Sequence, residues 1–253
     1  MPAASAHRVI VEAAIAELGA ELPKELLSGL LEGIVDPDAV PDREAKLRIT
    51  SRGRVSTRLG YAKHHSTSRV LVDYYFNLSL YNLRRGNEHG AGFMLGRALH
   101  YVQDGALSRR RYLVLDVHDE EEKAVNMLAK SAQRVEEVCK AVDVSSRRAS
   151  SRAEEALCIA LRETASLLKR FIEESTRPVN VAELKRRVTK IRLVKALLVL
   201  ALAFFAYTLP QLIAVSLLAT PAIIFYRPKT YYEAMRAGLM VLKPYGTKPA
   251  YEK

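Results

Sequence analysis

A run of 31 residues, Ala196 to Tyr226, carries no charged side chain and constrains the fold of this chain more than any other feature. A membrane-spanning helix needs about 20 apolar residues, and a soluble helix of this length without a charge would be hard to cover. Pro210 and Pro221 interrupt the run. The run therefore forms either a single kinked span or a hairpin of two short arms that turns at Thr208 to Pro210. We expect a membrane-embedded hairpin over residues 191–226.

Basic side chains flank the apolar run on both sides. They are Lys185, Arg186, Arg187, Lys190, Arg192 and Lys195 before it, and Arg227 and Lys229 after it. Under the positive-inside rule both flanks prefer the cytoplasm, and only a hairpin places them there together. We therefore expect a membrane-associated protein whose soluble domain is cytoplasmic. The alternative is a very apolar helical pair, or a dimer face, in a soluble protein.

The charge of the chain indicates its partners. A formal net charge of +11 and a pI near 9.7 predict attraction to polyanions. Membrane lipids, and an anionic bilayer surface in particular, fit both this charge and the apolar run. Nucleic acid fits the charge alone, because the chain has neither a zinc-finger spacing nor an aromatic-rich strand platform. We expect membrane lipid, and not nucleic acid, as the partner.

Outside the apolar run, the hydrophobic residues recur at the spacing of α-helices, and no stretch alternates convincingly as a strand. We predict an all-α protein. The expected helices cover about 5–18, 23–31, 66–85, 87–104, 119–142 and 152–174, and Asn180 caps a last long helix. Residues 33–42 are rich in Pro and Asp, and the basic stretch 43–63 shows no pattern. We expect both to be loops.

These patterns divide the chain into four expected parts. A helical domain covers 1–143, and a helical extension covers 144–190 after a polar hinge. The membrane hairpin covers 191–226, and a basic tail covers 227–253.

Cys139 and Cys158 are the only cysteines. Because two cysteines do not make the disulfide framework of a secreted domain, we expect buried thiols.

One predicted helix carries a metal-binding pattern in the sequence Gly96-Arg-Ala-Leu-His100-Tyr-Val-Gln-Asp104. His100 and Asp104 are four residues apart, so their side chains leave the same face of the helix. An imidazole nitrogen and a carboxylate oxygen at this spacing can bind one divalent metal. Gly96 lies one turn earlier on that face, where a missing side chain leaves room for another group to approach.

Further candidate ligands lie on either side of this helix. His118 and Glu122 repeat the four-residue spacing downstream. In chain order the whole set is His7, Asp36 or Asp38, His64, His65, His100, Asp104, His118 and Glu122. Neutral histidines mixed with carboxylates suit zinc, whereas Ca²⁺ and Mg²⁺ prefer shells made of oxygen alone. We expect these residues to form a zinc site.

At this point the chain resembles the zinc-dependent phospholipase C family, whose superfamily includes the S1/P1-type nucleases. Its signature helix, Leu-Gly-x-Ala-Leu-His-Tyr-x-x-Asp, is matched by Leu95 to Asp104. The other elements occur in the family's order: an N-terminal His (His7), an Asp in a Pro-containing loop (Asp36 or Asp38), another His (His64 or His65), and a His-x-x-x-Glu pair (His118 and Glu122). The resemblance covers about residues 5–125 and implies an all-α fold around a zinc cluster.

The resemblance also implies a role for each residue. His100, Asp104 and one of His64 and His65 would hold one zinc. His7 would hold a second zinc, with Asp104 as a bridge. His118 and Glu122 would supply half of the ligands of a third. Asp36 or Asp38 would orient a water as the general base. The family usually has another zinc-binding His six residues after the signature Asp, where this chain has Arg110, and a Pro where it has Ser108. We therefore expect one to three zinc ions with one position incomplete, and Arg110 is a candidate for binding substrate phosphate.

Three functions follow from these expectations. The first is a phospholipase C-like hydrolase that cleaves phosphodiesters in membrane lipid headgroups, because zinc lowers the pKa of a water to about 7 and stabilises charge on phosphate. The second is a non-catalytic, membrane-anchored helical scaffold that keeps the fold, which Arg110 in place of a ligand favours. The third is a zinc-dependent nuclease, although no aromatic pocket for stacking bases is visible in the sequence.

Overall fold

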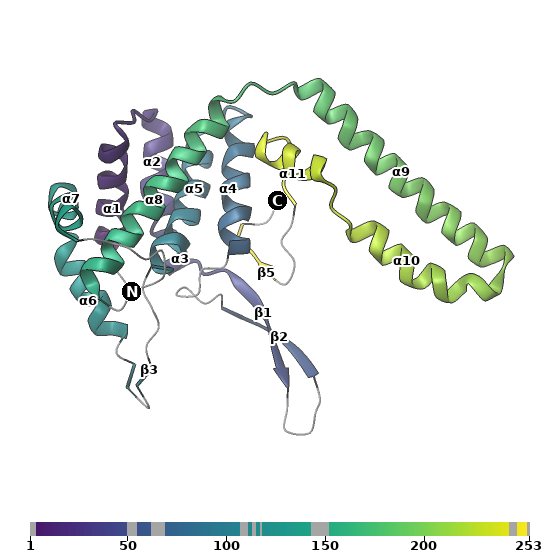
Figure 1. Ribbon diagram of the computed structural model, residues 1–253, viewed down its shortest axis with the longest axis horizontal. Coiled ribbons are helices and arrows are strands. Elements are labelled where there is room, and N and C mark those ends of the chain that lie inside the picture. Colours follow the sequence, from purple (N-terminus) through teal and green to yellow (C-terminus); the bar gives the residue numbers. More distant parts are fainter. Residues whose placement is uncertain are drawn as a thin grey trace.

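The computed structural model describes residues 4–49, 55–61, 69–106, 111–112, 115–116, 118–142, 152–242 and 247–251. In this part of the chain a helical bundle carries a long helical hairpin that projects from one side (Figure 1). The predicted all-α class is confirmed. The fold departs from the prediction in short strands and in the role of the chain's last residues.

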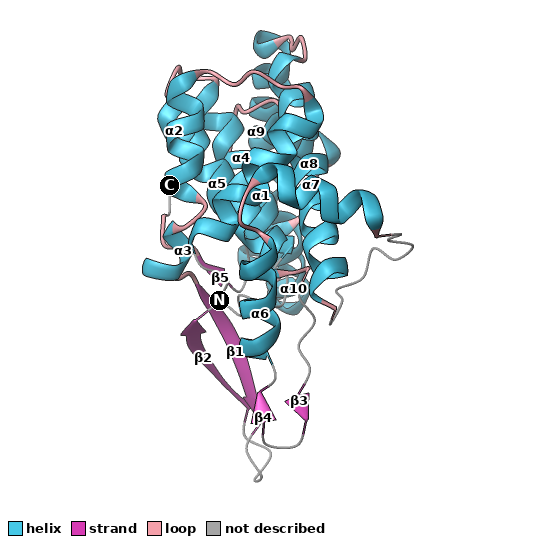
Figure 2. Cartoon of the chain, turned by 90° about the vertical axis from the view of Figure 1, so that its left-hand side faces the viewer, coloured by secondary structure: helices cyan, strands magenta, loops and turns pink. Residues whose placement is uncertain are grey.

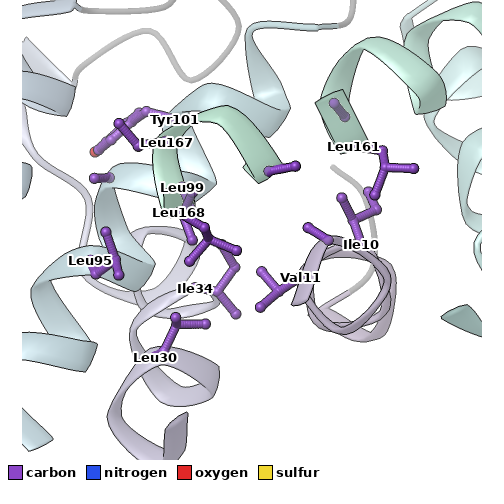
Figure 3. Packing of buried hydrophobic residues seen from close by; sticks show 14 of the residues in the cluster. Ile10, Val11, Leu30, Ile34, Leu95, Leu99, Tyr101, Leu161, Leu167 and Leu168 are labelled. Atoms are coloured by element: carbon purple, nitrogen blue, oxygen red, sulfur yellow. The ribbon is translucent and has the colours of Figure 1, made fainter. Parts of the chain in front are cut away.

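Five helices build the centre of the bundle. They are α1 (Ala4–Leu18), α2 (Lys24–Gly33), α4 (Arg69–Leu83), α5 (Glu88–Asp104) and α8 (Ala153–Thr176). Helix α8 crosses α1, α5 and α4 and closes the core over them (Figure 1). Side chains from these helices meet in one apolar cluster that includes Ile10, Leu30, Leu99 and Leu168 (Figure 3). Burial of this cluster is the main stabilisation of the bundle.

Two glycine pairs let α2 and α5 pack backbone against backbone. Gly29 and Gly33 on α2 face Gly92 and Gly96 on α5, each pair one helical turn apart. A Cβ atom added to Gly33 would lie 2.7 Å from the carbonyl carbon of Phe93, and one added to Gly96 would lie 2.6 Å from the amide nitrogen of Ile34. Real Cβ atoms do not approach so closely. The group that approaches Gly96 is therefore the end of helix α2.

The segment predicted as a single helix over 119–142 is two helices. Helix α6 (His118–Leu128) ends before α7 (Ala132–Ala141), and both pack against α1 and α8. Ser131 starts α7 as its N-cap, since its side chain accepts a hydrogen bond of 3.2 Å from the amide of Arg134. The periodicity of the whole segment hid this break, because a serine cap is a weak signal within a helical pattern.

The prediction of loops over 33–42 and 43–63 is wrong in part. Residues Asp36–Ala39 form a single helical turn, α3, with Pro37 in its first turn, where proline is favoured. Strands β1 (Arg43–Ile49) and β2 (Val55–Tyr61) form an antiparallel hairpin. The pattern 45, 47, 49 of small and apolar residues in β1 was a real strand signal, but basic residues between them made the segment look unpatterned.

The chain's end returns to the bundle, and the expected basic tail is not a separate part. Strand β5 (Thr247–Lys248) pairs antiparallel with β1 at the edge opposite β2. The hydroxyl of Tyr74 on α4 donates to the carbonyl of Tyr251 over 3.0 Å. Helix α8, expected within a separate extension over 144–190, lies in the main core. Residues before and after the apolar hairpin therefore belong to one domain.

Two further short strands, β3 (Arg111–Tyr112) and β4 (Leu115–Asp116), pair with each other.

Cys139 and Cys158 are joined by a disulfide, so the expectation of two free thiols is wrong. Their Cα atoms lie 5.2 Å apart, within the range that a disulfide requires. The bond links α7 to α8, and α7 in turn packs on α1. Helix packing brought together two positions that were 19 residues apart in sequence, which no local pattern predicts.

The apolar run forms a helical hairpin, as expected. Helix α9 (Val181–Thr208) goes out, the short 3-10 turn η1 (Pro210–Leu212) reverses the chain, and α10 (Ile213–Phe225) returns beside α9 (Figure 1). Asn180 caps α9 as predicted, accepting from the amide of Glu183 over 3.0 Å. Two helical stretches, Val181–Thr208 and Pro210–Arg236, are long and apolar enough to cross a membrane. Helix α11 (Lys229–Arg236) then returns the chain to the bundle.

We predict that Gly96→Val destabilises the bundle by about 3 kcal/mol, because its side chain would force α2 away from α5. The measurement is chemical unfolding of the full chain in detergent, followed by circular dichroism. His89→Val, at an exposed position of the same helix, is the control for adding a β-branched residue to α5 and should change the free energy of unfolding by less than about 1 kcal/mol. Equal effects of the two substitutions would contradict the close helix crossing.

Candidate metal centre

Helix α5 presents His100 and Asp104 on one buried face, as the four-residue spacing predicted. The Nε2 atom of His100 lies 3.2 Å from Oδ2 of Asp104, and both side chains are almost wholly buried. The crossing at Gly96 brings the end of α2 to the other side of the imidazole. There the Nδ1–H of His100 donates to the carbonyl oxygen of Ile34 over 2.8 Å. This hydrogen bond leaves Nε2 as the nitrogen with a lone pair, which is the form that binds a metal.

His7, on the first turns of α1, reaches the same place from the opposite side. Its Nε2 atom lies 3.6 Å from Oδ1 of Asp104, and its ring centroid is 4.6 Å from that of His100. Its Nδ1–H donates to Oε1 of Gln103 over 2.6 Å. The amide nitrogen of Gln103 in turn donates to Thr164 Oγ1 on α8 over 3.2 Å. Gln103 Nε2 also donates to the backbone carbonyl oxygen of His7 over 3.5 Å. Because a carbonyl can only accept, this bond fixes the orientation of the amide, so Oε1 accepts and His7 also keeps its lone pair on Nε2.

Helix α3 supplies a carboxylate to this cluster. The Oδ1 atom of Asp38 lies 3.6 Å from His100 Nε2. One ligand atom from each of His7, Asp38 and His100 falls within 4.8 Å of the other two. Two donors on one tetrahedral zinc lie roughly 3.4 Å apart, since each is about 2.1 Å from the ion. The separations of 3.2, 3.6 and 3.6 Å around His100 and His7 match that value and are too long, in two cases, for hydrogen bonds.

The buried polar atoms of the cluster are short of partners. Within the residues that the structure describes, His7 Nε2 and Asp38 Oδ1 are buried and make no hydrogen bond. Burial of a polar atom without a partner costs about 1–3 kcal/mol, and a bound cation would remove that cost for both atoms at once. The donor set of two imidazoles and two carboxylates therefore fits a metal ion.

The two imidazoles differ in their electrostatic surroundings. Burial, and then the neighbouring His100, lower the pKa of His7, so that its ring is neutral. Burial also acts to lower the pKa of His100, but the charge and hydrogen bond of Asp104, helped by Asp38, raise it overall. A cation in place of a proton would be attracted by the same carboxylates. Metal and protons therefore compete at His100.

Arg97 explains why Asp38, rather than Asp36, belongs to this cluster. The Arg97 side chain is wholly buried and pairs with Asp36, with Asp42 over 2.9 Å and with the carbonyl of Val40 over 3.1 Å. These bonds tie the segment around α3 to α5. Asp36 is thereby committed to Arg97, and Asp38, two residues later, faces His100.

Asp42 is the centre of a second buried network beside the metal cluster. It accepts hydrogen bonds from the hydroxyls of Tyr75 and Tyr101 and from the amide of Ala250. Burial and the Asp42 charge raise the pKa of both tyrosines, so they act as donors. The ring of Tyr251 lies 4.9 Å from the guanidinium carbon of Arg97. Ala250 and Tyr251 thus cover the network that holds α3 in place.

The structure does not describe the side chains of the remaining predicted ligands. His64, His65, Ser108 and Arg110 lie outside the part of the chain that the structure describes. His118 is the first residue of α6 and Glu122 lies in its second turn, but their side chains fall outside the description. The N-terminal end of α1, the short α3 and α6 all lie toward the end of the bundle from which β1 and β2 project (Figure 2).

Residue-by-residue reasoning missed the groups that orient the ligands. Gln103, Arg97, Asp42 and Thr164 were not singled out. The available signal was the presence of Arg97 and Gln103 inside a helix whose faces are otherwise largely apolar, since buried polar side chains need partners.

Comparison of the chain with known protein families, with curated proteins and with solved structures finds no match. The chemistry of this centre is therefore inferred from its own side chains.

We predict that Asp38→Asn and Asp36→Asn have different effects. Asp38→Asn should weaken the binding of a divalent metal about tenfold or more because it removes a charged ligand, measured with zinc as the probe by competition with a chromophoric chelator. Asp36→Asn should instead lower the free energy of unfolding by about 1–3 kcal/mol, because Arg97 keeps its burial but loses one anionic partner. Equal zinc affinities of the two variants would contradict this division of roles.

Proposed function

We propose that this protein is a zinc-dependent phosphodiester hydrolase that acts on phospholipid headgroups at a membrane surface. The observation that carries the proposal is the pair of buried histidines, His7 and His100. Their Nδ1 atoms are both bound to acceptors, and their Nε2 atoms both face Asp104. Such orientation of ligands by a second layer of hydrogen bonds is typical of metal sites.

The donor types support zinc. His7, His100, Asp38 and Asp104 would hold the ion, and two imidazole nitrogens among the ligands disfavour Ca²⁺ and Mg²⁺. The two oxygens of Asp104 face different histidines, so Asp104 would help to hold a metal at both rings. Zinc bound here would supply a Lewis acid that lowers the pKa of a water to about 7 and offsets the charge of a phosphodiester.

The protein's own residues would divide the remaining work. Asp38 has 22% of its side chain exposed, against 1% for Asp104, so solvent water can reach Asp38 more readily. Because Oδ1 of Asp38 faces His100, we assign to its second oxygen the acceptance of a proton from the attacking water. This proton would pass to the leaving glycerol oxygen as the bond between that oxygen and phosphorus breaks. Asp104 would face both histidines, and Gln103 and the Ile34 carbonyl would keep both rings in their metal-binding tautomer. Arg97 would hold α3, and so Asp38, against α5.

The hairpin supports membrane lipid as the substrate class. Large apolar side chains on its surface are exposed, among them Leu200 at 65% and Leu218 at 79%. A contiguous apolar surface of this kind marks a membrane or protein contact, and the length of both helical stretches favours the membrane. A chain anchored in this way would meet phospholipid at a high effective concentration.

The fold also supports the hairpin topology in the bilayer. Because β5 pairs with β1 and Tyr251 contacts Asp36 and Arg97, the segments before and after the hairpin lie in one folded domain. That domain must stand on one side of the membrane. We propose the cytoplasmic side, in line with the basic flanks. The Cys139–Cys158 disulfide then requires a cytoplasm that preserves protein disulfides, as in hyperthermophilic cells.

We predict that the purified chain contains at least one zinc per molecule and hydrolyses phospholipid in vesicles. Asp104→Asn should lower the zinc content, measured by elemental analysis, and reduce the release of phosphorylated headgroup at least a hundredfold. Glu173→Gln, at an exposed position of α8, is the matched control and should change neither. Zinc without hydrolysis of either phospholipid or a small phosphodiester would favour the non-catalytic scaffold instead. No zinc in the wild-type chain would exclude the proposed hydrolase.

For the topology, single cysteines in a Cys139→Ser, Cys158→Ser background provide the test. Lys24→Cys lies in the bundle and Lys229→Cys follows the hairpin, and both positions are exposed. We predict that a membrane-impermeant maleimide labels both only after the cells are permeabilised. Labelling of the two positions from opposite sides would show a single span. Labelling of both in intact cells would place the domain outside.

A further inference from the structure

The base of the hairpin contains a groove that the metal chemistry does not use. It lies between α9 and α10, close to the point where the chain leaves and re-enters the bundle, and has a volume of about 560 Å³. Val194 and Leu198 of α9 and Ile223 of α10 form its apolar part, which we call its floor. Val194 and Leu198 remain about half exposed. An apolar groove of this kind needs an apolar occupant.

The part of the groove formed by Lys190 and Lys195, which we call its mouth, is positively charged. Lys190 and Lys195, both on α9, line it, and among the described residues no acidic side chain does. Lys195 Nζ donates to the carbonyls of Ile224 and Tyr226 at the C-terminal end of α10. An ammonium group has three N–H donors, so Lys195 keeps one donor for a ligand. Lys190 is exposed and adds a second positive charge one and a half turns earlier.

The groove crosses the level at which the headgroups of a bilayer would lie. The charge-free run begins at Ala196 and ends at Tyr226, so Lys195 and Arg227 mark the boundary of the hydrocarbon. From Lys190 to Leu198 the helix rises about 12 Å at ~1.5 Å per residue. The headgroup region on one side of a bilayer is about 5–8 Å thick. The mouth of the groove therefore lies among headgroups and its floor beside acyl chains.

From this arrangement we infer that the groove between α9 and α10 binds one anionic phospholipid, with its phosphate at Lys190 and Lys195 and an acyl chain along Val194, Leu198 and Ile223. A single negative charge is attracted by two ammonium groups, and the apolar floor excludes a free phosphate as the occupant. This inference rests on the membrane-embedded hairpin of the proposed function, but it does not depend on zinc or on hydrolysis.

The test is native mass spectrometry of the full chain in detergent, titrated with phosphatidylglycerol or phosphatidylcholine. The wild type should bind the first phosphatidylglycerol at least fivefold more tightly than phosphatidylcholine. Lys190→Gln should lose about fivefold in affinity for phosphatidylglycerol, the effect of one basic residue at a lipid surface, and keep its affinity for phosphatidylcholine. Lys185→Gln, an exposed lysine on α9 that does not line the groove, should stay within twofold of the wild type.

A second pair of variants tests the floor of the groove. Ala222→Phe fills it and should weaken the binding of both lipids, whereas Ala214→Phe, on α10 but outside the groove, should weaken neither. Equal affinity of the wild type for the two lipids, or equal losses in Lys190→Gln and Lys185→Gln, would overturn the inference. Zinc content measured on the same samples separates the two proposals: selective lipid binding by a zinc-free chain defeats only the hydrolase. Zinc with unselective lipid binding defeats only the groove.

Discussion

The close crossing of α2 and α5 is the constraint on which the rest of the structure depends. Four glycines let the two backbones meet, and the crossing ends with the Ile34 carbonyl against His100. Without that approach His100 would have no acceptor for Nδ1–H, and α3, which follows α2 directly, would not bring Asp38 to the imidazole. A packing feature made of missing side chains thus sets the tautomer of a ligand and the position of a carboxylate. The cost is conformational, because each glycine loses more freedom on folding than alanine would.

The buried Arg97 network is the second constraint, and it links regions far apart in sequence. Arg97 and Asp42 connect α5, the α3 segment, α4 and the residues after α11. A buried ion pair adds little net stability, but removal of one partner is costly. The network therefore selects one arrangement of these segments. It also makes residues 247–251 part of the domain that carries the candidate metal centre, so the hairpin leaves and re-enters the same domain.

Sequence reasoning was most successful where the determining interactions are local. Helix periodicity and the Asn180 cap depend on neighbours a few residues away. The expectation of a loop over 43–63 was wrong because strand β1 is paired with residues 55–61 on one edge and with residues 247–248 on the other. The expectation of two free thiols was wrong for the same reason, since the distance between Cys139 and Cys158 is set by how α7 and α8 pack.

For the candidate site, the sequence by itself determined that His100 and Asp104 share one helix face and that the run from Ala196 to Tyr226 must be covered by something other than water. Both follow from the geometry of a single helix and the absence of charge. Only the tertiary structure decided that His7 joins them, that Asp38 faces the cluster while Asp36 pairs with Arg97, and that Gln103 orients His7. Those outcomes depend on which helices cross and where, and crossing is determined by side-chain volume and buried polar partners across the whole core rather than by any spacing along the chain.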